Sequence, residues 1–136
     1  MRMADSVPVQ EGLFTADADG EARLVGGRCA SCGRHQFPLG SVCPYCGGDD
    51  VAEVRLSPGG TLWAWTAVTA APPGYKGTVP YGFGVVELPE GIRVLTRLTE
   101  SDPSALTFGQ DVHLRLVPLH TDDDGRAVLT WAFGAR

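Results

Sequence analysis

The chain contains four cysteines arranged as two Cys-x-x-Cys pairs with ten residues between the pairs: Cys29, Cys32, Cys43 and Cys46. Two intervening residues allow both sulfurs of a pair to face one ion. Each pair is followed by a glycine, Gly33 or Gly47, and glycine accepts the positive φ that such a tight turn often requires. Four thiolates complete a tetrahedral zinc site, so the pattern predicts one structural Zn²⁺.

Other chemistry at these cysteines fits the pattern less well. A catalytic zinc keeps one coordination position open for water, and four thiolates leave none. A thioredoxin-like redox site favours a single Cys-x-x-Cys in a βαβ setting, which the sequence does not suggest. An iron–sulfur or rubredoxin-like iron site remains an alternative for the same ligands. In each of these metal-site interpretations all four thiols are ligands, so none is predicted to act as a nucleophile.

The elements that must position these cysteines divide the chain into three predicted segments. Residues 24–56 form the zinc ribbon, whose metal supplies on the order of 10 kcal/mol to a module too small for a core of its own. Residues 1–23 are rich in polar and small side chains and are interpreted as an N-terminal arm. Within that arm, residues 16–20 have the composition of a loop, while Leu13 and Phe14 are candidate anchors.

Residues 57–136 have the pattern of a small β-barrel. Five apolar runs are separated by turn signals, at residues 61–70, 82–88, 92–99, 112–117 and 127–133. Pro-Glu-Gly at 89–91 predicts a hairpin, and Asp-Pro-Ser at 102–104 predicts a capped helical turn after the third strand. This order predicts a mainly β protein with a five-stranded OB-fold barrel; a five-stranded sandwich or SH3-like barrel is the alternative. Alternation places Trp63 and Trp65 on one face of the first strand, and one of them is expected to pack in the barrel or against the ribbon.

Composition restricts the partners of the chain. The 136 residues are 43% hydrophobic and 20% charged, with a formal charge of −5, and no segment carries a stripe of Lys and Arg. This disfavours nucleic acid and anionic membranes as binding targets. The first twelve residues lack a signal-like apolar stretch, and no run is long enough to span a bilayer. We therefore expect a cytoplasmic protein, where paired cysteines bind metals more often than they form disulfides.

Several motifs occur in an order that resembles a known family. They are LVGGRC at 24–29, GRHQFP at 33–38, CPYCG at 43–47, LSPGGTLW at 56–63, PPGY at 72–75, PY at 80–81, VEL at 86–88, GIRVL at 91–95 and Gly109 ahead of a strand. Over about residues 24–117 the chain resembles the zinc-ribbon and OB-fold proteins known as domain of unknown function thirty-five. Many members of that family begin with a helical arm, whereas the corresponding segment here is short and its Asp-Ala-Asp-Gly run forms helices poorly.

The resemblance implies a companion role. Proteins of this family accompany thiolase-fold enzymes as subunits or fused domains, and the thiolase-like chain carries the chemistry. It therefore implies a non-catalytic scaffold subunit in a hetero-oligomer built on the partner's dimer, with an acyl-CoA substrate bound at or near the interface. The implied reactions make or break C–C bonds in acyl-CoA and lipid metabolism, such as retro-aldol cleavage of a steroid side chain as part of an aldolase complex.

The segment 70–81 between the first two strands is the best candidate for partner or acyl-CoA contact. Its three prolines limit its conformations, so docking costs little entropy, and its tyrosines are of a type enriched at interfaces. Lys76, the only lysine of the chain, has the charge to meet a CoA phosphate or a carboxylate of the partner. We select as contact residues Pro73, Tyr75, Lys76, Tyr81 and Trp63. A rigid exposed loop without a ligand is the alternative interpretation.

Other functions remain as alternatives. OB-folds also bind single-stranded nucleic acid on aromatic side chains, but the basic groove that this requires is missing from the sequence. His35, His113 and His120 are expected to be structural or surface residues rather than catalytic ones. The acidic run at 122–124 lacks the loop of a calcium site, so it predicts a solvated hairpin turn.

Overall fold

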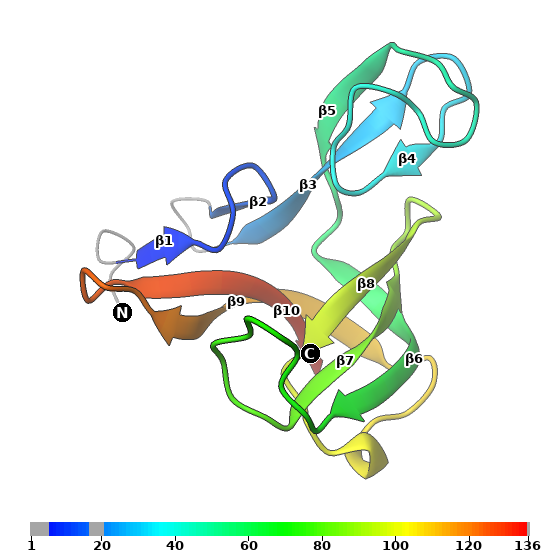
Figure 1. Cartoon of the computed structure of the whole chain (residues 1–136). Coiled ribbons are helices and arrows are strands. Elements are labelled where there is room, and N and C mark those ends of the chain that lie inside the picture. Colours follow the sequence, from blue (N-terminus) through cyan, green and yellow to red (C-terminus); the bar gives the residue numbers. More distant parts are fainter. Residues whose placement is uncertain (1–5, 17–20, 136) are drawn as a thin grey trace.

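The computed structural model describes residues 6–16 and 21–135; most of the loop expected at 16–20 lies outside them. The described residues form strands and one 3₁₀ turn, without an α-helix (Figure 1). The elements are β1 (Ser6–Pro8), β2 (Phe14–Ala16), β3 (Ala22–Cys29), β4 (His35–Gln36), β5 (Val51–Arg55), β6 (Gly59–Val68), β7 (Tyr81–Glu87), β8 (Arg93–Leu98), η2 (Pro103–Ala105), β9 (Asp111–Thr121) and β10 (Ala127–Ala135). No helix of the described part is long and apolar enough to cross a membrane.

Strands β6 to β10 close the predicted five-stranded barrel. β6, β7 and β8 form an antiparallel meander, β8 pairs in parallel with β10, β10 pairs with β9, and β9 returns to β6. This strand order, with η2 between the third and fourth strands, is the OB-fold topology, so the predicted fold class is confirmed.

The predicted turns form as their residues dictate. At the β7–β8 hairpin the amide of Gly91 donates to the carbonyl of Leu88, and Gly91 has a φ of 87°. At η2 the carboxylate of Asp102 accepts hydrogen bonds from both the amide and the hydroxyl of Ser104, with Pro103 next to the cap. These contacts are those of an N-cap followed by proline at the first helical position.

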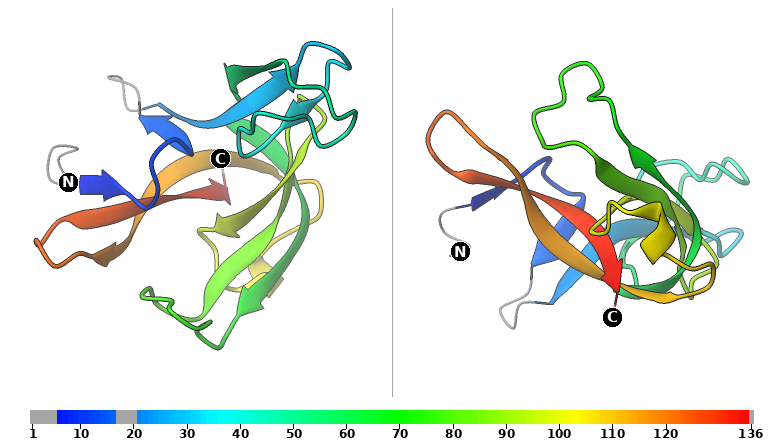
Figure 2. Two further views of the ribbon diagram at one scale, coloured as in Figure 1. Left: turned by 45° about the horizontal axis from the view of Figure 1, so that its top comes forward. Right: turned by 90° about the horizontal axis from the view of Figure 1, so that it is seen from below.

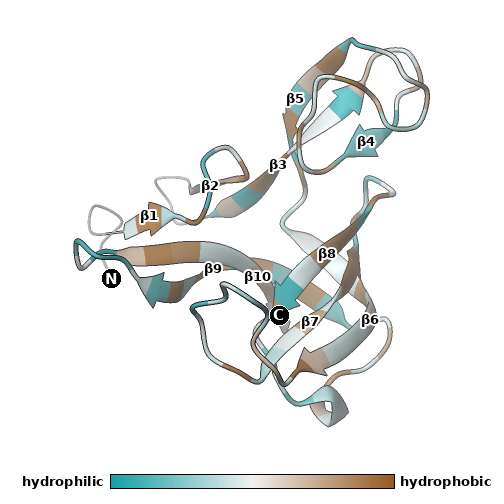
Figure 3. Cartoon of the chain, in the orientation of Figure 1, coloured by the Kyte–Doolittle hydropathy of each residue, from teal (hydrophilic) through white to brown (hydrophobic). Residues whose placement is uncertain are grey.

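β9 and β10 are longer than the sequence pattern indicates. The predicted strand ended at residue 117, whereas β9 continues to Thr121 and pairs with β10 from Val112 to the hairpin turn. Pro118 interrupts the pattern. It pairs with Leu129 of β10 beside a bulge, where the register shifts between Val128 and Leu129, and a strand tolerates proline at such a position. The hairpin therefore extends beyond the barrel (Figure 2), and its acidic tip is teal in Figure 3.

The two tryptophans of β6 do not share one face. A bulge between Leu62 and Ala64 inserts Trp63 as an extra residue and shifts the alternation of the strand. Trp65 then packs against the core and donates from its indole nitrogen to the carbonyl of Pro103 at 3.0 Å. Trp63 is 42% exposed. The prediction that the two tryptophans share one face of the strand was therefore wrong, because the bulge turns Trp63 outward.

The ribbon is a small antiparallel sheet in which β3 lies between β4 and β5. Its close packing requires glycine in β3: a Cβ at Gly26 would lie 2.5 Å from the carbonyl oxygen of Gln36, and one at Gly27 would lie 2.6 Å from Val51. The arm contributes two short strands. β1 pairs in parallel with β10, and β2 pairs with the start of β3.

One hydrophobic core joins the base of the ribbon to the barrel. Ala22 and Leu24 of β3 and Leu56 after β5 belong to the same buried cluster as the barrel residues Val86 and Phe133. At the junction, the amide and hydroxyl of Ser57 both donate to Glu90 at the tip of the β7–β8 hairpin, at 2.8 and 2.9 Å. The core and this contact hold the ribbon against the barrel.

Candidate functional site

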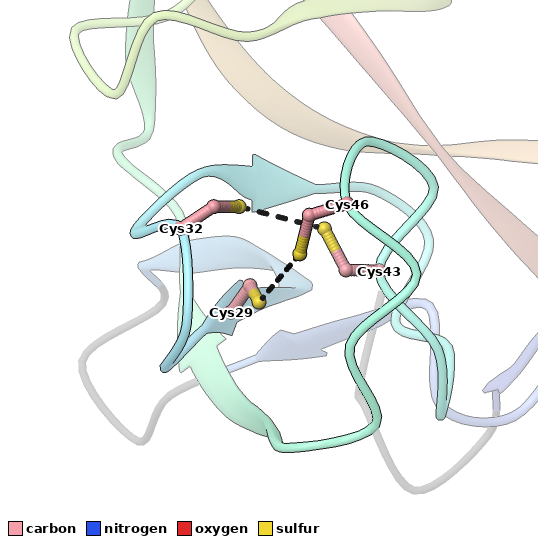
Figure 4. Close-up of side chains that lie close together, drawn as sticks. All are labelled: Cys29, Cys32, Cys43 and Cys46. Carbon is pink, nitrogen blue, oxygen red and sulfur yellow. Dashed lines mark hydrogen bonds between the residues drawn. The ribbon is translucent and has the colours of Figure 1, made fainter.

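The four cysteines converge at the end of the ribbon, from the end of β3 and from two turns (Figure 4). Their sulfur atoms all lie within 4.8 Å of one another, and the pairs Cys29–Cys46 and Cys32–Cys43 are each 3.6 Å apart. Sulfurs bound tetrahedrally at 2.3 Å from zinc are about 3.8 Å apart. A disulfide would bring two sulfurs to about 2.05 Å. The spacing therefore fits four ligands around one metal ion.

Both halves of the cluster have the same backbone geometry. The amide of Gly33 donates to the carbonyl of Cys29 at 2.8 Å, and the amide of Gly47 donates to the carbonyl of Cys43 at 3.0 Å. The two glycines have φ values of 76° and 78°, as the sequence pattern predicted. The amide of Tyr45 also points at the sulfur of Cys43, at 3.4 Å. Amides directed at sulfur favour the thiolate, which is the form that binds metal.

The electrostatics of the cluster favour a cation at its centre. The amide of Cys32 holds the pKa of the Cys29 thiol down at about 6, despite its burial. Burial opposes ionisation of Cys43, but the amides of Cys46 and Tyr45 outweigh it and lower the pKa of that thiol. At Cys46 the Gly48 amide favours the thiolate, yet the neighbouring sulfurs raise the pKa to about 11. A divalent metal offsets this repulsion, so the four cysteines form a zinc-ribbon-type metal-binding group.

Tyr75 and Tyr81 make contacts that hold the 70–81 loop in place. Their rings are 5.0 Å apart, and the Tyr75 hydroxyl donates to the carbonyl of Thr78 at 2.8 Å. The same hydroxyl accepts a hydrogen bond from Arg97 at 2.8 Å, and the Arg97 guanidinium lies 4.6 Å from the centre of the Tyr81 ring. The two tyrosines thus hold the loop against β8.

Sequence reasoning missed Arg97 as a partner of this loop. The alternation in β8 could have indicated that Arg97 points outward. Val94, Thr96 and Leu98 are buried, and the residues between them, Leu95 and Arg97, face away from the core.

The other predicted contact residues are exposed. Pro73 and Lys76 lie at the surface of the loop. Trp63 lies on the barrel, with the Arg93 guanidinium 4.0 Å from its ring centre and the Phe108 ring centroid at 6.5 Å. Phe108 is 65% exposed, and Leu95 on the same face as Arg93 is 64% exposed. The barrel therefore presents exposed apolar side chains close to arginine.

The three histidines lie in separate environments. His35 pairs with Arg28 in the ribbon sheet, and His120 contacts the carbonyl of Thr121 at 3.2 Å. His113 was expected at the surface, but its side chain is only 26% exposed, because it packs beside Glu21 with 3.4 Å between Nε2 and the carboxylate. The contact with the end of the arm accounts for this difference.

Comparisons with known proteins agree with this architecture. Residues 16–52 match the family model described as the ChsH2 rubredoxin-like zinc ribbon domain, and residues 53–117 match that of the ChsH2 C-terminal OB-fold domain. The chain is similar to a solved structure of an "Ltp2-ChsH2(DUF35) aldolase", with 29% identity, a TM-score of 0.64, and coverage of 83% of this chain and 84% of the other.

Two curated relatives cover most of the chain. A "DUF35 domain-containing scaffold protein" of Pyrococcus furiosus is 31% identical over 127 residues, which are 93% of each chain. A "Benzoylsuccinyl-CoA thiolase subunit BbsA" of Thauera aromatica is 34% identical over 122 residues, which are 89% of this chain and 83% of the relative. Together with the two domain matches, these relatives show that the chain belongs to the DUF35 family of zinc-ribbon and OB-fold proteins.

Proposed function

We propose that this chain is a non-catalytic accessory subunit of a thiolase-superfamily acyl-CoA enzyme. The observation that carries the proposal is its alignment, over 89% of its length, with a protein named as a thiolase subunit. The similarity to one chain of an aldolase assembly supports the same role. The partner is a thiolase-fold protein, and the hetero-oligomer is built on the partner's dimer.

The geometry supports a scaffold rather than an independent catalyst. All four thiols of the chain converge on one metal-binding group, which commits them as ligands to a structural Zn²⁺. The catalytic nucleophile and base would then belong to the partner. The zinc holds the ribbon in shape, and the shared core fixes the ribbon relative to the barrel.

The exposed residues of the loop and barrel are proposed to contact the partner or its acyl-CoA. Pro73 and Lys76 are accessible on the loop, and Trp63 is accessible on the barrel. Tyr75 and Tyr81 contribute indirectly, because their contacts with Arg97 hold the loop in place. Lys76 is suited to a phosphate of CoA or a carboxylate of the partner.

The reaction of the complex is proposed to make or break a C–C bond in the cytoplasm. Retro-aldol cleavage of a steroid side chain is the preferred example, and thiolytic cleavage of another bulky acyl-CoA is the second.

A single-stranded nucleic-acid-binding protein is the alternative from a different class. Its support is the OB-fold with exposed aromatic side chains, and the charge of −5 opposes it. Binding of a labelled oligonucleotide at low and moderate salt separates the two functions. Sub-micromolar binding that weakens steeply with salt would favour the alternative.

The proposal is tested by co-expressing the chain with a thiolase-fold candidate partner from the same organism. We expect the two to elute together in gel filtration. Lys76→Ala should then weaken the complex or raise KM without changing the zinc content. This variant is preferable to one at Tyr75, which would also disturb the loop. Glu53→Ala is a matched control, since Glu53 is an exposed charge on the ribbon away from the loop.

A further inference from the structure

We propose that Arg97 forms a binding site for an oxyanion, a phosphate ester or a carboxylate, in a pocket beside the 70–81 loop. The inference goes beyond the accessory role proposed above and does not depend on it. It rests on the way Arg97 is held, on the absence of a carboxylate partner for its charge among the described residues, and on the residues that line the pocket.

The guanidinium of Arg97 is held in one position. It lies over the Tyr81 ring at 4.6 Å, and its Nη1 donates to the hydroxyl of Tyr75 at 2.8 Å. That hydroxyl is itself fixed, because it donates to the carbonyl of Thr78. An arginine that is already ordered loses little rotamer freedom when it binds an anion.

Most hydrogen-bond donors of Arg97 remain available. A guanidinium carries five N–H donors, and within the described part of the chain one of them binds a side-chain partner, the Tyr75 hydroxyl. Among the same residues, no carboxylate lies within ion-pair distance of Arg97. Its positive charge is thus half-buried, and residues 6–16 and 21–135 place no carboxylate beside it.

A second stacked arginine on the same strand shows the contrast. Arg93 lies over the Trp63 ring at 4.0 Å, but it also pairs with Glu87 at 3.0 Å. Glu87 is its cross-strand neighbour in β7, whereas the neighbour of Arg97 at the corresponding position is Phe83. The sheet supplies a carboxylate to one arginine and a phenyl ring to the other.

The pocket beside Arg97 has the chemistry of an anion site. It measures about 290 Å³, slightly below the size that holds a drug-sized ligand, and this suits one small charged group. Besides Arg97, its lining includes the hydroxyl-bearing residues Thr78, Thr99 and Ser101, and none of the described residues that line it is acidic. Arginine with neighbouring hydroxyl donors is a common arrangement for phosphate and carboxylate recognition.

General electrostatics would not produce such binding. The chain carries a net charge of −5, so its overall field repels anions. Binding at Arg97 would have to come from local contacts, and it should therefore saturate and depend on single residues.

The test is an NMR titration of the ¹⁵N-labelled full chain with sodium phosphate and, separately, with sodium acetate. Sodium chloride keeps the ionic strength constant. We expect saturable shifts of the Arg97 Nε–H and of the amides of Thr78, Thr99 and Ser101, with a Kd on the order of millimolar. The probe that saturates at the lower concentration identifies the group, a phosphate ester or a carboxylate.

Four variants assign the effect to the proposed site. Arg97→Gln should abolish the saturable shifts, and Arg93→Gln, on the same strand, should leave them unchanged. Phe83→Glu keeps Arg97 but places a carboxylate opposite it, and should weaken binding at least tenfold, whereas Phe83→Gln should bind nearly as the wild type does. Absence of saturable shifts with both probes would overturn the proposal. So would equal binding by Arg97→Gln, or by Phe83→Glu with the spectrum of a folded protein.

Discussion

Phe37 of the ribbon and Trp131 of the barrel meet edge to face, with ring centroids 5.6 Å apart and an interplanar angle of 83°. Phe14 of β2 approaches the same indole at 6.4 Å. Trp131 therefore contacts the arm and the ribbon from its place in β10, and it couples three segments that are distant in the sequence. Edge-to-face aromatic pairs contribute about 0.5–1.5 kcal/mol beyond the area that they bury.

Trp131→Ala should lower the free energy of unfolding by about 2–3 kcal/mol, less than the loss at a fully buried aromatic residue because Trp131 is partly buried. Trp131→Phe keeps a ring and removes the buried indole nitrogen, which has no hydrogen-bond partner among the residues that the structure describes, so it should cost less than about 1.5 kcal/mol. Urea unfolding followed by circular dichroism measures both. Equal losses of unfolding free energy in the two variants would show that the aromatic contacts of Trp131 do not couple the arm and the ribbon to the barrel.

The bulge in β6 predicts different roles for its two tryptophans. Trp65→Ala should destabilise the barrel by about 2–3 kcal/mol, because Trp65 packs on the core and donates to Pro103. Trp63→Ala should cost less than about 1 kcal/mol in thermal or urea unfolding, since Trp63 is exposed. In the presence of the proposed partner, the Trp63 variant should instead weaken the complex. A strongly destabilised Trp63 variant would contradict the outward position of this side chain.

Metal removal should unfold the ribbon. Elemental analysis should find about one zinc per chain, and Cys29→Ser or Cys46→Ser should lose it and become protease-sensitive within residues 24–56. His35→Ala is the control, because it lies in the ribbon and leaves all four sulfurs in place. A wild-type chain that stays folded and protease-resistant without any metal would refute the structural role. One iron per chain would support the same ligands with the alternative ion.

The β9–β10 turn predicts a pH dependence of stability. Asp122 accepts hydrogen bonds from the amides of Arg126 and Asp124, and with the charge of Arg126 they hold its pKa below the ordinary 3.8. Because the pKa is lower in the folded state, the carboxylate stabilises the fold above about pH 4, and this contribution is lost as the pH falls toward the lower value.

Asp122→Asn should therefore melt at a lower temperature than the wild type at pH 7. The difference in melting temperature should shrink as the pH falls below about 4 toward the lowered folded-state pKa of Asp122, because the wild-type carboxyl becomes protonated there. Asp124→Asn is a matched control with a smaller expected effect, because Asp124 is 76% exposed and its side chain makes one polar contact within the described part of the chain, with Arg126. If the difference in melting temperature between Asp122→Asn and the wild type persists unchanged at low pH, the charge of Asp122 does not contribute to stability.

Local sequence signals located the five barrel strands and the four metal ligands, although β9 and β10 are longer than the pattern indicated. Pro-Glu-Gly, Asp-Pro-Ser and the two Cys-x-x-Cys-Gly turns act over a few residues, so their outcome follows from the residues themselves. The separation of Trp63 from Trp65 could not be predicted, since a bulge depends on the pairing with β7. The contact of Arg97 with Tyr75, and the parallel pairing of Ser6 with Ala127, join residues far apart in the chain. Such contacts depend on the completed fold rather than on local patterns.

The central claim is that a thiolase-fold enzyme requires this chain as a subunit. Its most direct test compares a thiolase-fold candidate partner expressed alone with the same protein expressed together with this chain, by light scattering after gel filtration and by turnover of an acyl-CoA substrate. We expect a hetero-oligomer of defined mass, and activity that is absent or strongly reduced without this chain. A partner that is soluble and fully active alone, and that forms no complex with this chain, would contradict the claim.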